Sequence, residues 1–309
     1  MLDLGSLALF VKVAELRSVT AAANELQIAQ PSVSRKMKRL SDQLGVQLFT
    51  RNGRTIELSE HGLIFLEHAR NLLAEAHDLE DLMRSKAAIP TGPLSVGLPH
   101  SFTATITEEF AVAIRAEQPR VQVYVVEGTS LGLRAALLQK TLDLAIVTSM
   151  EPDNDIVTRS LVTEPMMLIG PEAAQLSEPV ALQAVLKFPL ILTPQPNSMR
   201  KITDRAFGGL GAAPKLVLET NTGLSGALVA RGAGYTVLPY SALISMRRLH
   251  DLSAAPIQGL TVEWQIVRHK KRPETAACRI ARELIARLVE KAIDSREWPF
   301  ASLPKVRPD

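Results

Sequence analysis

Cysteine is nearly missing from this sequence. Its 309 residues include one cysteine, Cys278, which excludes an intrachain disulfide and a metal site built only from cysteines. Scarce cysteine is typical of a reducing compartment, so we expect the protein to be cytoplasmic. Because Cys278 lies within the last predicted helix and has no histidine near it in the sequence, we expect a buried structural thiol.

Long apolar runs are also missing. No run approaches the ~18 apolar residues that span a bilayer, so we expect no membrane partner. Residues 1–13 are apolar, but they include Asp3 and lack a basic start and a small-residue cleavage site, so we expect no secretory signal. Their apolar residues recur at helical spacing and predict an amphipathic first helix instead.

Motifs for catalysis are absent as well. The six histidines lack the close spacing of metal ligands, and there is neither a Gly-x-Ser-x-Gly motif nor a GK[ST] phosphate loop. The glycines at 208–211 follow a predicted helix and those at 232–234 precede a strand, whereas a dinucleotide loop needs the order strand, glycines, helix. We therefore expect no enzyme, no metal and no cofactor.

The chain has little net charge, and the distribution of its charges is more informative than their sum. The net charge is +3, and with 46% hydrophobic and 22% charged residues the composition is that of a soluble globular protein of two or three domains. Residues 27–55 nevertheless hold six basic side chains against one acid, Asp42. A local basic segment of this kind indicates contact with phosphates.

This basic segment contains a predicted helix with two different faces. A short small-residue helix at 18–26 comes first, capped by Ser18, and Pro31 then suits the first turn of the second helix. Taking about 100° per residue, four apolar residues of the second helix fall on one stripe, and the opposite face is basic. We expect the stripe to pack inward and the basic face to point to solvent. The stripe consists of Val33, Met37, Leu40 and Leu44.

The basic helix has the width that fits the major groove of B-DNA, where the N-terminal residues of such a helix reach base edges. Arg35 can present two donors to guanine, Gln30 can pair with adenine, and Ser34 can contact bases or phosphate. Lys38 and Arg39 are better placed to hold phosphates. The predicted DNA-contacting residues, with those of the hairpin that follows, are Gln30, Pro31, Ser32, Ser34, Arg35, Lys38, Arg39, Arg51 and Arg54.

A hairpin is predicted directly after the helix. Gly45 ends the helix, and two short strands at 46–51 and 55–58 are joined through an Asn-Gly pair, a strong turn signal. Arg51 and Arg54 lie at the tip of this hairpin. It can therefore act as a wing that follows phosphates or the minor groove.

The same segment resembles a known family. The run FVKVAELRSVTAAANELQIAQPSVSRKMKRLSDQLGVQLFTRNGRTIELSEHG is similar to the N-terminal signature of the LysR-type transcriptional regulators, and the resemblance is dense over residues 4–85. QPSVSR and LG-x-x-LF-x-R are its most specific parts. Ala29 departs from the serine often found before the Gln-Pro pair, which weakens the helix cap. The resemblance implies operator contacts at Gln30, Pro31, Ser34 and Arg35.

One long helix is predicted from residue 60 to about 86. Apolar and small residues recur along it at alternating spacings of four and three, a pattern that is buried against a partner helix. About 27 helical residues span ~40 Å, more than so small a domain can cover, and similar regulators dimerise through this helix. We expect a homodimer, assembling further into a homotetramer, on double-stranded operator DNA with dyad symmetry. The predicted dimer-contacting residues are Leu66, Ala69, Leu73, Ala76 and Met83.

Beyond a linker that contains proline and glycine, predicted strands alternate with helices. This alternation indicates an α/β architecture with largely parallel sheets. Extended segments at 156–161 and 166–169 join two such series, which suggests two subdomains with a cleft between them. The layout resembles the periplasmic-binding-protein-like effector domain of LysR-type regulators. The predicted domains are the winged helix-turn-helix at 1–58, the linker helix at 59–89 and the effector-binding domain at 90–300, with subdomain I at about 91–161 and 268–296 and subdomain II at about 162–267.

The predicted cleft is lined by groups that suit an anion. Ligands in open α/β folds bind beyond the carboxyl ends of strands, near helix N-termini. Hydroxyl and free N–H groups there suit a carboxylate, although each Ser or Thr could also serve only as a helix cap. We expect a small anionic metabolite as the effector, and Arg200 could add positive charge. The predicted effector-contacting residues are Pro99, His100, Ser101, Phe102, Thr129, Ser130, Thr148, Ser149, Asn197 and Ser198.

These features together favour a transcription regulator of LysR type that responds to a small molecule. Two alternatives stay open at the level of sequence. One is an architectural DNA-binding protein without an effector, and the other is a solute-binding receptor with an N-terminal fusion. The missing secretion signal counts against the receptor.

Overall fold

The computed structural model describes residues 2–52, 55–85, 90–148, 153–247 and 249–304. The chain divides into two compact units. The first comprises Met1–Lys86 and Gln139–Thr141, and the second comprises Ala87–Leu138 and Leu142–Asp309. The long helix predicted from residue 60 therefore belongs to the same unit as the N-terminal motif.

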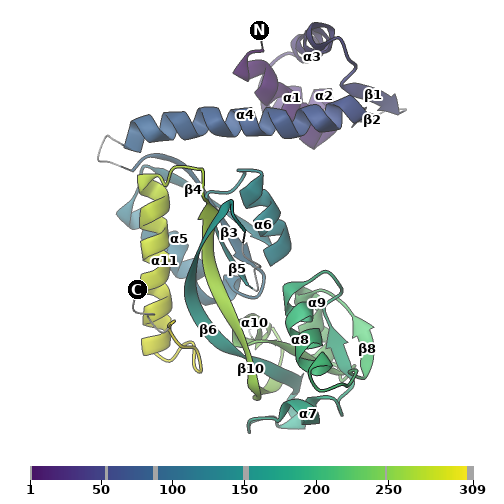
Figure 1. Ribbon diagram of the computed structural model, residues 1–309, viewed down its shortest axis with the longest axis vertical. Helices are drawn as coiled ribbons and strands as arrows, with labels where there is room; N and C mark the ends of the chain where they lie inside the picture. The colour runs from purple at the N-terminus through teal and green to yellow at the C-terminus, as the bar shows by residue number, and fades with distance from the viewer. Residues whose placement is uncertain (1, 53–54, 86–89, 149–152, 248, 305–309) are drawn as a thin grey trace. The chain divides into compact units, whose positions relative to one another are not determined.

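The first unit is a winged helix-turn-helix that continues into a long helix, as the sequence predicts (Figure 1). Asp3 and Ser18 cap its first two helices by accepting hydrogen bonds from the N–H groups of Ser6 (2.8 Å) and Ala21 (3.1 Å). Its elements are α1 (Leu4–Leu16), α2 (Val19–Glu25), α3 (Gln30–Leu44), β1 (Phe49–Asn52), β2 (Thr55–Leu58) and α4 (Glu60–Ser85).

Side chains from all four helices fill the core of this unit. The ring of Phe10 is fully buried, with its centroid 5.1 Å from that of Phe49 and 4.9 Å from that of Phe65. Gly62 lets α4 approach the hairpin, because a Cβ atom there would lie 2.0 Å from the carbonyl oxygen of Leu48. The first half of α4 is thus part of this core.

The second unit has two halves joined by two long strands. Its first half contains β3 (Gly92–Pro99), α5 (Thr103–Glu117), β4 (Val121–Gly128), α6 (Ser130–Leu138), β5 (Leu144–Thr148) and α11 (Ala276–Asp294). Its second half contains η1 (Glu172–Ala174), α7 (Leu182–Val185), β7 (Leu190–Leu192), α8 (Ser198–Gly208), β8 (Leu216–Glu219), α9 (Thr222–Ala230), β9 (Tyr235–Pro239) and α10 (Tyr240–Arg247). The joining strands are β6 (Ile156–Pro171) and β10 (Leu252–His269).

All eight strands of the second unit form one sheet, in the order β4-β3-β5-β10-β6-β9-β7-β8. The pairs within each half are parallel, as predicted, but β10 is antiparallel to β5 and β6, and β6 is antiparallel to β9. The expectation of largely parallel sheets is thus corrected to a mixed sheet. The antiparallel pairs are those that join the two halves.

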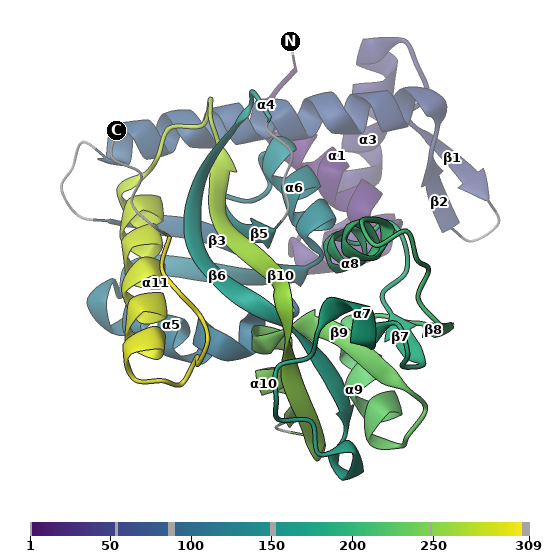
Figure 2. The ribbon, with the colours of Figure 1, turned by 60° about the horizontal axis from the view of Figure 1, so that its bottom comes forward.

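Strands β6 and β10 run side by side through both halves (Figures 1 and 2). Their pairing extends from Ile156 opposite His269 to Leu252 opposite Pro171. The sequence predicts only fragments of both strands, because prolines interrupt the apolar pattern. Pro165 lies opposite Thr261 at a register shift, where a residue without an N–H group is tolerated.

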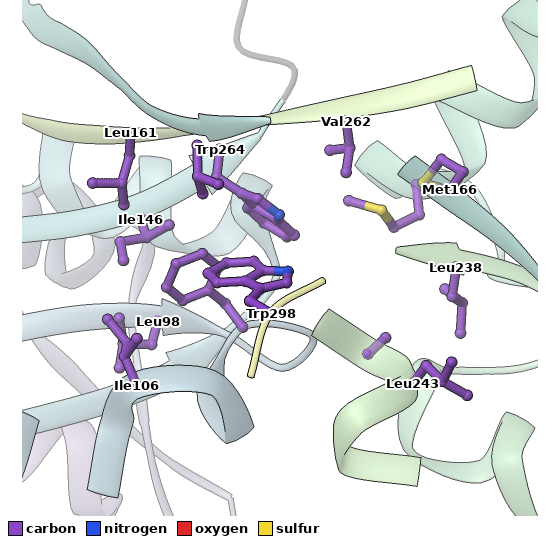
Figure 3. Close-up of a cluster of buried hydrophobic side chains, with 14 of the residues drawn as sticks. Leu98, Ile106, Ile146, Leu161, Met166, Leu238, Leu243, Val262, Trp264 and Trp298 are labelled. Atoms are coloured by element: carbon purple, nitrogen blue, oxygen red, sulfur yellow. The ribbon is translucent and has the colours of Figure 1, made fainter. Parts of the chain in front are cut away.

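The buried core of the second unit is continuous across the two halves. Figure 3 shows Trp264 and Trp298 in the middle of it, with Ile146 and Leu161 on one side and Leu238 on the other. Both indole rings are almost fully buried. The two halves therefore meet at an aromatic centre that lies beside the joining strands.

Candidate DNA interface and effector cleft

Helix α3 has the two faces that the sequence predicts. Its buried stripe contains Val33, Met37 and Leu40, which pack into the core of the first unit. On its other side Arg35 and Lys38 are exposed. The C-cap Gly45 has a φ of 70°, the left-handed conformation that ends a helix at lowest cost with glycine. Arg39, Pro31 and Gln30 are exposed as well, and Ser32 and Ser34 are half-buried.

The basic side chains of α3 are available to a ligand. In the described part of the first unit, ion pairs join Lys12 to Glu15 and Glu25, Arg70 to Glu15, and Lys140 to Glu75, and none involves a cation of α3. Lys36 interacts electrostatically with Asp3, but Arg35, Lys38 and Arg39 have no ion-pair partner among the described residues of this unit. An exposed cationic helix face of this kind fits the phosphates and base edges of a major groove.

The start of α3 carries a polar pair instead of a side-chain cap. Ala29 at the N-cap makes no capping hydrogen bond, as its departure from the family pattern predicts. Gln30 Nε2 donates to Ser34 Oγ at 3.1 Å, one turn further along the helix. This pair holds the amide of Gln30 at the N-terminal end of α3.

The predicted wing is present as strands β1 and β2, which pair antiparallel from Phe49 opposite Leu58 to Asn52 opposite Thr55. Arg51 lies in β1. The prediction for Arg54 lies outside the described residues.

The dimer-contacting residues predicted on α4 differ in exposure. Ala69 is fully buried, whereas Leu66 and Leu73 are half-buried and pack beside it against the core of their own unit. Their contact with a second copy of the chain stays a prediction. Ala76 is half-buried and Met83 is exposed. The exposed apolar residues of α4 are Leu63, Ile64, Leu72, Leu79 and Met83.

Most of the predicted effector residues meet in one small cavity of the second unit, which we call the cradle. Its volume is about 30 Å³, which is room for a water molecule or one functional group. The hydroxyls of Ser101 and Ser130 are nearly buried there. The predicted residues that line the cradle are Pro99, His100, Ser101, Thr129, Ser130, Asn197 and Ser198.

Several cradle residues also serve the local fold. Thr129 Oγ1 accepts a hydrogen bond from Gly132 N at 3.1 Å, and Asn197 Oδ1 accepts one from Met199 N at 2.8 Å. These bonds cap α6 and α8, so the capping role that the sequence left open is present. They also hold two helix N-termini, with their partial positive charge, at the cradle.

Two predicted effector residues lie elsewhere. The ring of Phe102 is fully buried in the aromatic centre, 5.3 Å from Trp264 and 5.2 Å from Trp298. Thr148 is buried and donates from Oγ1 to the carbonyl of Glu263 at 2.7 Å. Neither lines the cradle. The prediction for Ser149 lies outside the described residues.

A larger cavity adjoins the cradle and shares His100 and Thr222 with it; we call it the chamber. Its volume is about 320 Å³, within the usual size range of small-molecule sites. His100 Nδ1 lies 2.9 Å from Glu127 Oε1 at its wall, and Thr103 Oγ1 donates to the same oxygen at 2.9 Å. The chamber is lined by His100, Glu127, Asn221, Thr222, Gly223, Gly226, Ala242, Ser245, Met246, Leu249 and His250.

Sequence reasoning missed most of the chamber, because its wall is built by α9 and α10 across from the first half. It also missed Trp264, which lines the cradle from the joining strand β10. No motif marks these residues, and only the fold brings them to the cleft. Among the described residues that line the two cavities there is no Lys or Arg.

Arg200, the other cation considered for the cleft, is used by the fold. Its guanidinium donates to Asp204 Oδ1 at 2.7 Å and to the carbonyl of Thr193 at 3.1 Å, and it pairs with Glu219. Its side chain is only 14% exposed. Arg200 therefore neutralises carboxylates of its own half and lies outside both cavities.

Cys278 lies in α11 and is 3% exposed, as predicted for a structural thiol. Burial, with Asp143 and Glu274 nearby, raises the pKa of this thiol to about 12. At neutral pH it is therefore protonated and unreactive.

The described residues include no cluster of His, Cys, Asp and Glu that could hold a metal ion. In the same residues no helix has the length and hydropathy needed to cross a membrane.

Two protein families match the chain, one over each unit. Residues 4–63 match the bacterial regulatory helix-turn-helix proteins of the lysR family, and residues 87–290 match the LysR substrate binding domain. Matches to both parts favour a regulator with an effector domain over the architectural and receptor alternatives.

Individual proteins match over most of the chain. The nitrogen assimilation regulatory protein nac of Klebsiella aerogenes is 32% identical, over 79% of this chain and 81% of that protein. The hydrogen peroxide-inducible genes activator of Dickeya chrysanthemi is 27% identical, over 81% of this chain and 83% of that protein. Full-length CbnR in complex with its target DNA has the same fold, with a TM-score of 0.69 and 23% identity over 94% of this chain and 100% of that one. The chain therefore belongs to the LysR family of DNA-binding transcription regulators, which carry a substrate-binding domain for effectors.

Proposed function

We propose that this regulator reads its operator through the exposed face of α3 and that a small ligand in the cradle and chamber controls it. The observation that carries the first part is that Arg35, Lys38 and Arg39 are exposed on α3 and form no ion pair among the described residues, opposite the buried Val33, Met37 and Leu40. Arg35 and Gln30 near the start of the helix would contact base edges, and Lys38 and Arg39 would contact phosphates. The wing, with Arg51 and Arg54, would add contacts to the DNA backbone. Because its target is genomic DNA, we place the protein in the cytoplasm.

We infer that the effector is a small molecule with one anionic group. Hydroxyls and the N-termini of α6 and α8 would bind that group in the cradle. The cradle holds about 30 Å³, so the rest of the molecule would occupy the chamber of about 320 Å³. The lack of Lys and Arg among the described lining residues favours a single negative charge over a polyanion, since several charges would need cations to balance their desolvation.

We infer that the protein acts as a homodimer or a higher homo-oligomer. The apolar stripe of α4 that includes Leu72, Leu79 and Met83 is exposed, and a second α4 would cover it. In the second unit, both edge strands carry exposed apolar residues, including Val125 in β4 and Val217 in β8. Unprotected edges of this kind are suited to pairing with another copy. Two α3 helices in a dimer would reach two half-sites.

The chemistry of this chain favours a binding role over catalysis. The cleft contains no metal-ligand cluster among its described residues, and the protonated Cys278 is unsuited to be a nucleophile.

The same thiol also distinguishes this chain from a thiol-based peroxide sensor. It is the only cysteine in the sequence, so no intrachain disulfide can form.

Footprinting on the DNA upstream of its own gene tests the proposal. We expect the purified protein to protect two half-sites about one helical turn or a multiple of it apart. Arg35→Ala should weaken the protection, so that it appears only at higher protein concentration, whereas substitution of the exposed Gln43 at the other end of α3 should preserve it. Protection without dyad symmetry, or protection that Arg35→Ala leaves unchanged, would refute the proposed reading helix.

A further inference from the structure

The segment after α11 folds back onto the rest of the second unit. Residues Trp298–Ser302 lie beyond residue 290, where the match to the LysR substrate binding domain ends. Trp298 N donates to the carbonyl of Ala292 at 2.9 Å, which turns the chain back at the end of the helix. The following residues then reach β6 and α10. We call Trp298–Ser302 the strap.

The strap is bonded to a joining strand by its backbone. Thr163 N donates to the carbonyl of Ser302 at 2.9 Å, and Ser302 N donates to the carbonyl of Thr163 at 2.8 Å. This antiparallel bridge holds the strap at the middle of β6. The strap is thus attached where the chain passes from one half of the unit to the other.

The side chain of Trp298 enters the aromatic centre (Figure 3) and is 1% exposed. Its ring packs edge-on against Phe102, at 5.2 Å between centroids and an interplanar angle of 72°. Phe102 in turn packs against Trp264, which lines the cradle, and it directly follows Ser101, which also lines the cradle. Trp298 therefore supports the cradle from behind.

A buried carboxylate joins these parts. Glu164 is 1% exposed, follows Thr163 in β6, and accepts hydrogen bonds from Trp298 Nε1 (2.9 Å) and Trp264 Nε1 (2.5 Å). It also accepts from Ser241 N (2.8 Å) and Ser241 Oγ (2.6 Å), at the start of α10. Burial raises the pKa of Glu164, and these four donors oppose that shift. Their number satisfies the acceptor capacity of one carboxylate.

The strap also contacts the second half directly. The ring of Phe300 packs edge-on against Tyr240, the first residue of α10, at 6.0 Å between centroids. The strap thus touches the first half through Phe102, the joining strand through Thr163, and the second half through Tyr240.

We propose that the strap is a positioning element of the effector cleft, in which Trp298 and Glu164 hold Trp264 and Phe102 behind the cradle and fasten the two halves to each other. This role rests on the proposed effector site. Any rearrangement of the cleft that moves one half relative to the other must change the contacts of Trp298 or the hydrogen bonds to Glu164. The strap therefore sets the geometry that a ligand meets.

Hydrogen–deuterium exchange on the full chain and its variants tests this role. In Trp298→Ala we expect amide exchange at Thr163, Ser241 and Phe102 to be about tenfold faster or more, because their partners or supports are lost. Exchange in β7 and β8, far from the strap in the sheet, should stay unchanged. A Trp298→Phe variant keeps a ring against Phe102 but removes the Nε1 donor, so it should restore slow exchange at Phe102 and not at Ser241.

Two controls separate this role from general stabilisation. Leu303→Ala removes an exposed side chain just beyond the strap and should leave exchange at all three sites as in the wild type. Glu164→Gln removes one of the two carboxylate acceptors and should shift the emission of the only two tryptophans, both of which donate to it. Uniformly faster exchange across the second unit in Trp298→Phe, or exchange unchanged at the three sites in Trp298→Ala, would overturn the proposal. Operator binding, measured in parallel, reports on the proposed function separately.

Discussion

The two candidate sites of this protein are built in different ways. The residues of α3 that we expect to contact DNA lie within one helix of 15 residues, and the helical spacing alone places Arg35 and Lys38 on its exposed side. The cleft takes its residues from Pro99 to Trp264, and seven elements must assemble before it exists. A site on one helix depends on local spacing, whereas a site between halves depends on topology. This difference predicts that substitutions on α3 act on DNA alone, and that substitutions around the cleft act through shape.

The largest effect on operator affinity is expected from a substitution in α4, the helix through which we expect two copies of the chain to associate. Leu72→Glu places a charge on the exposed apolar stripe of α4, so it should disrupt the oligomer and weaken operator binding by roughly 10²-fold, because the second half-site no longer adds to the affinity. Light scattering gives the mass and a filter or gel assay gives the affinity. Glu67→Gln, on an exposed part of the same helix, should change neither. An unchanged mass in Leu72→Glu would remove this stripe from the interface.

Arg35→Ala should cost roughly 1–3 kcal/mol of operator binding and relax the preference at one base pair, if its guanidinium contacts guanine with two donors. Arg35→Lys is the matched control: it keeps the charge and loses the fork, so it should also relax the preference. Affinities for a set of operators with single base changes measure this. An equal loss on every sequence would reassign Arg35 to a phosphate.

A single substitution in the cleft should change ligand affinity less than Arg35→Ala changes operator affinity. Ser101→Ala removes one hydroxyl from the cradle and should weaken binding of a monocarboxylate ligand by about 0.5–1.5 kcal/mol, the net worth of one hydrogen bond. Ser253→Ala, which removes a buried hydroxyl that donates to the carbonyl of Pro171 outside both cavities, should lower stability but not ligand affinity. Calorimetric titration distinguishes the two. Equal affinities in Ser101→Ala and the wild type would exclude this hydroxyl from the site.

The smallest effect on operator affinity is expected from oxidation at Cys278. Hydrogen peroxide should leave operator affinity unchanged, since the thiol is buried and protonated. Its pKa is raised from 9.0 to about 12, so it contributes stability that is fully present below about pH 9 and is lost as the pH rises towards 12. Urea unfolding should therefore show a steeper alkaline loss in the wild type than in Cys278→Ala. Parallel curves for the two proteins would contradict this assignment.

The sequence predicts the features that depend on local spacing better than those that depend on topology. The stripe of α3, the Gly45 cap and the Ser18 cap depend on neighbours within a few residues, and the structure has all three. In the second unit, the short apolar runs Leu190–Leu192 and Leu216–Glu219 form β7 and β8. Short apolar runs between turn residues are enough to locate such strands.

The features that the sequence did not predict depend on distant partners. The first half of β10 has no clear alternation of its own, and its pairing with β6 makes it a strand. Leu66 and Leu73 have the spacing of a dimer seam, yet they also pack against the core of their own unit, and spacing alone cannot identify the partner. Trp298 carries no motif, and its role is visible only where Glu164 and Phe102 meet it.

The most direct test of the account joins the two sites in one thermodynamic cycle. The ligand is a monocarboxylate that binds the wild type and binds Ser101→Ala more weakly. The affinity for operator is measured with and without this ligand. The affinity for the ligand is then measured with and without operator. The account predicts that both affinities change by the same factor, roughly 5–150-fold, as coupling between two sites requires. A ligand that fills the cleft while both affinities stay unchanged would contradict control of α3 by the cleft.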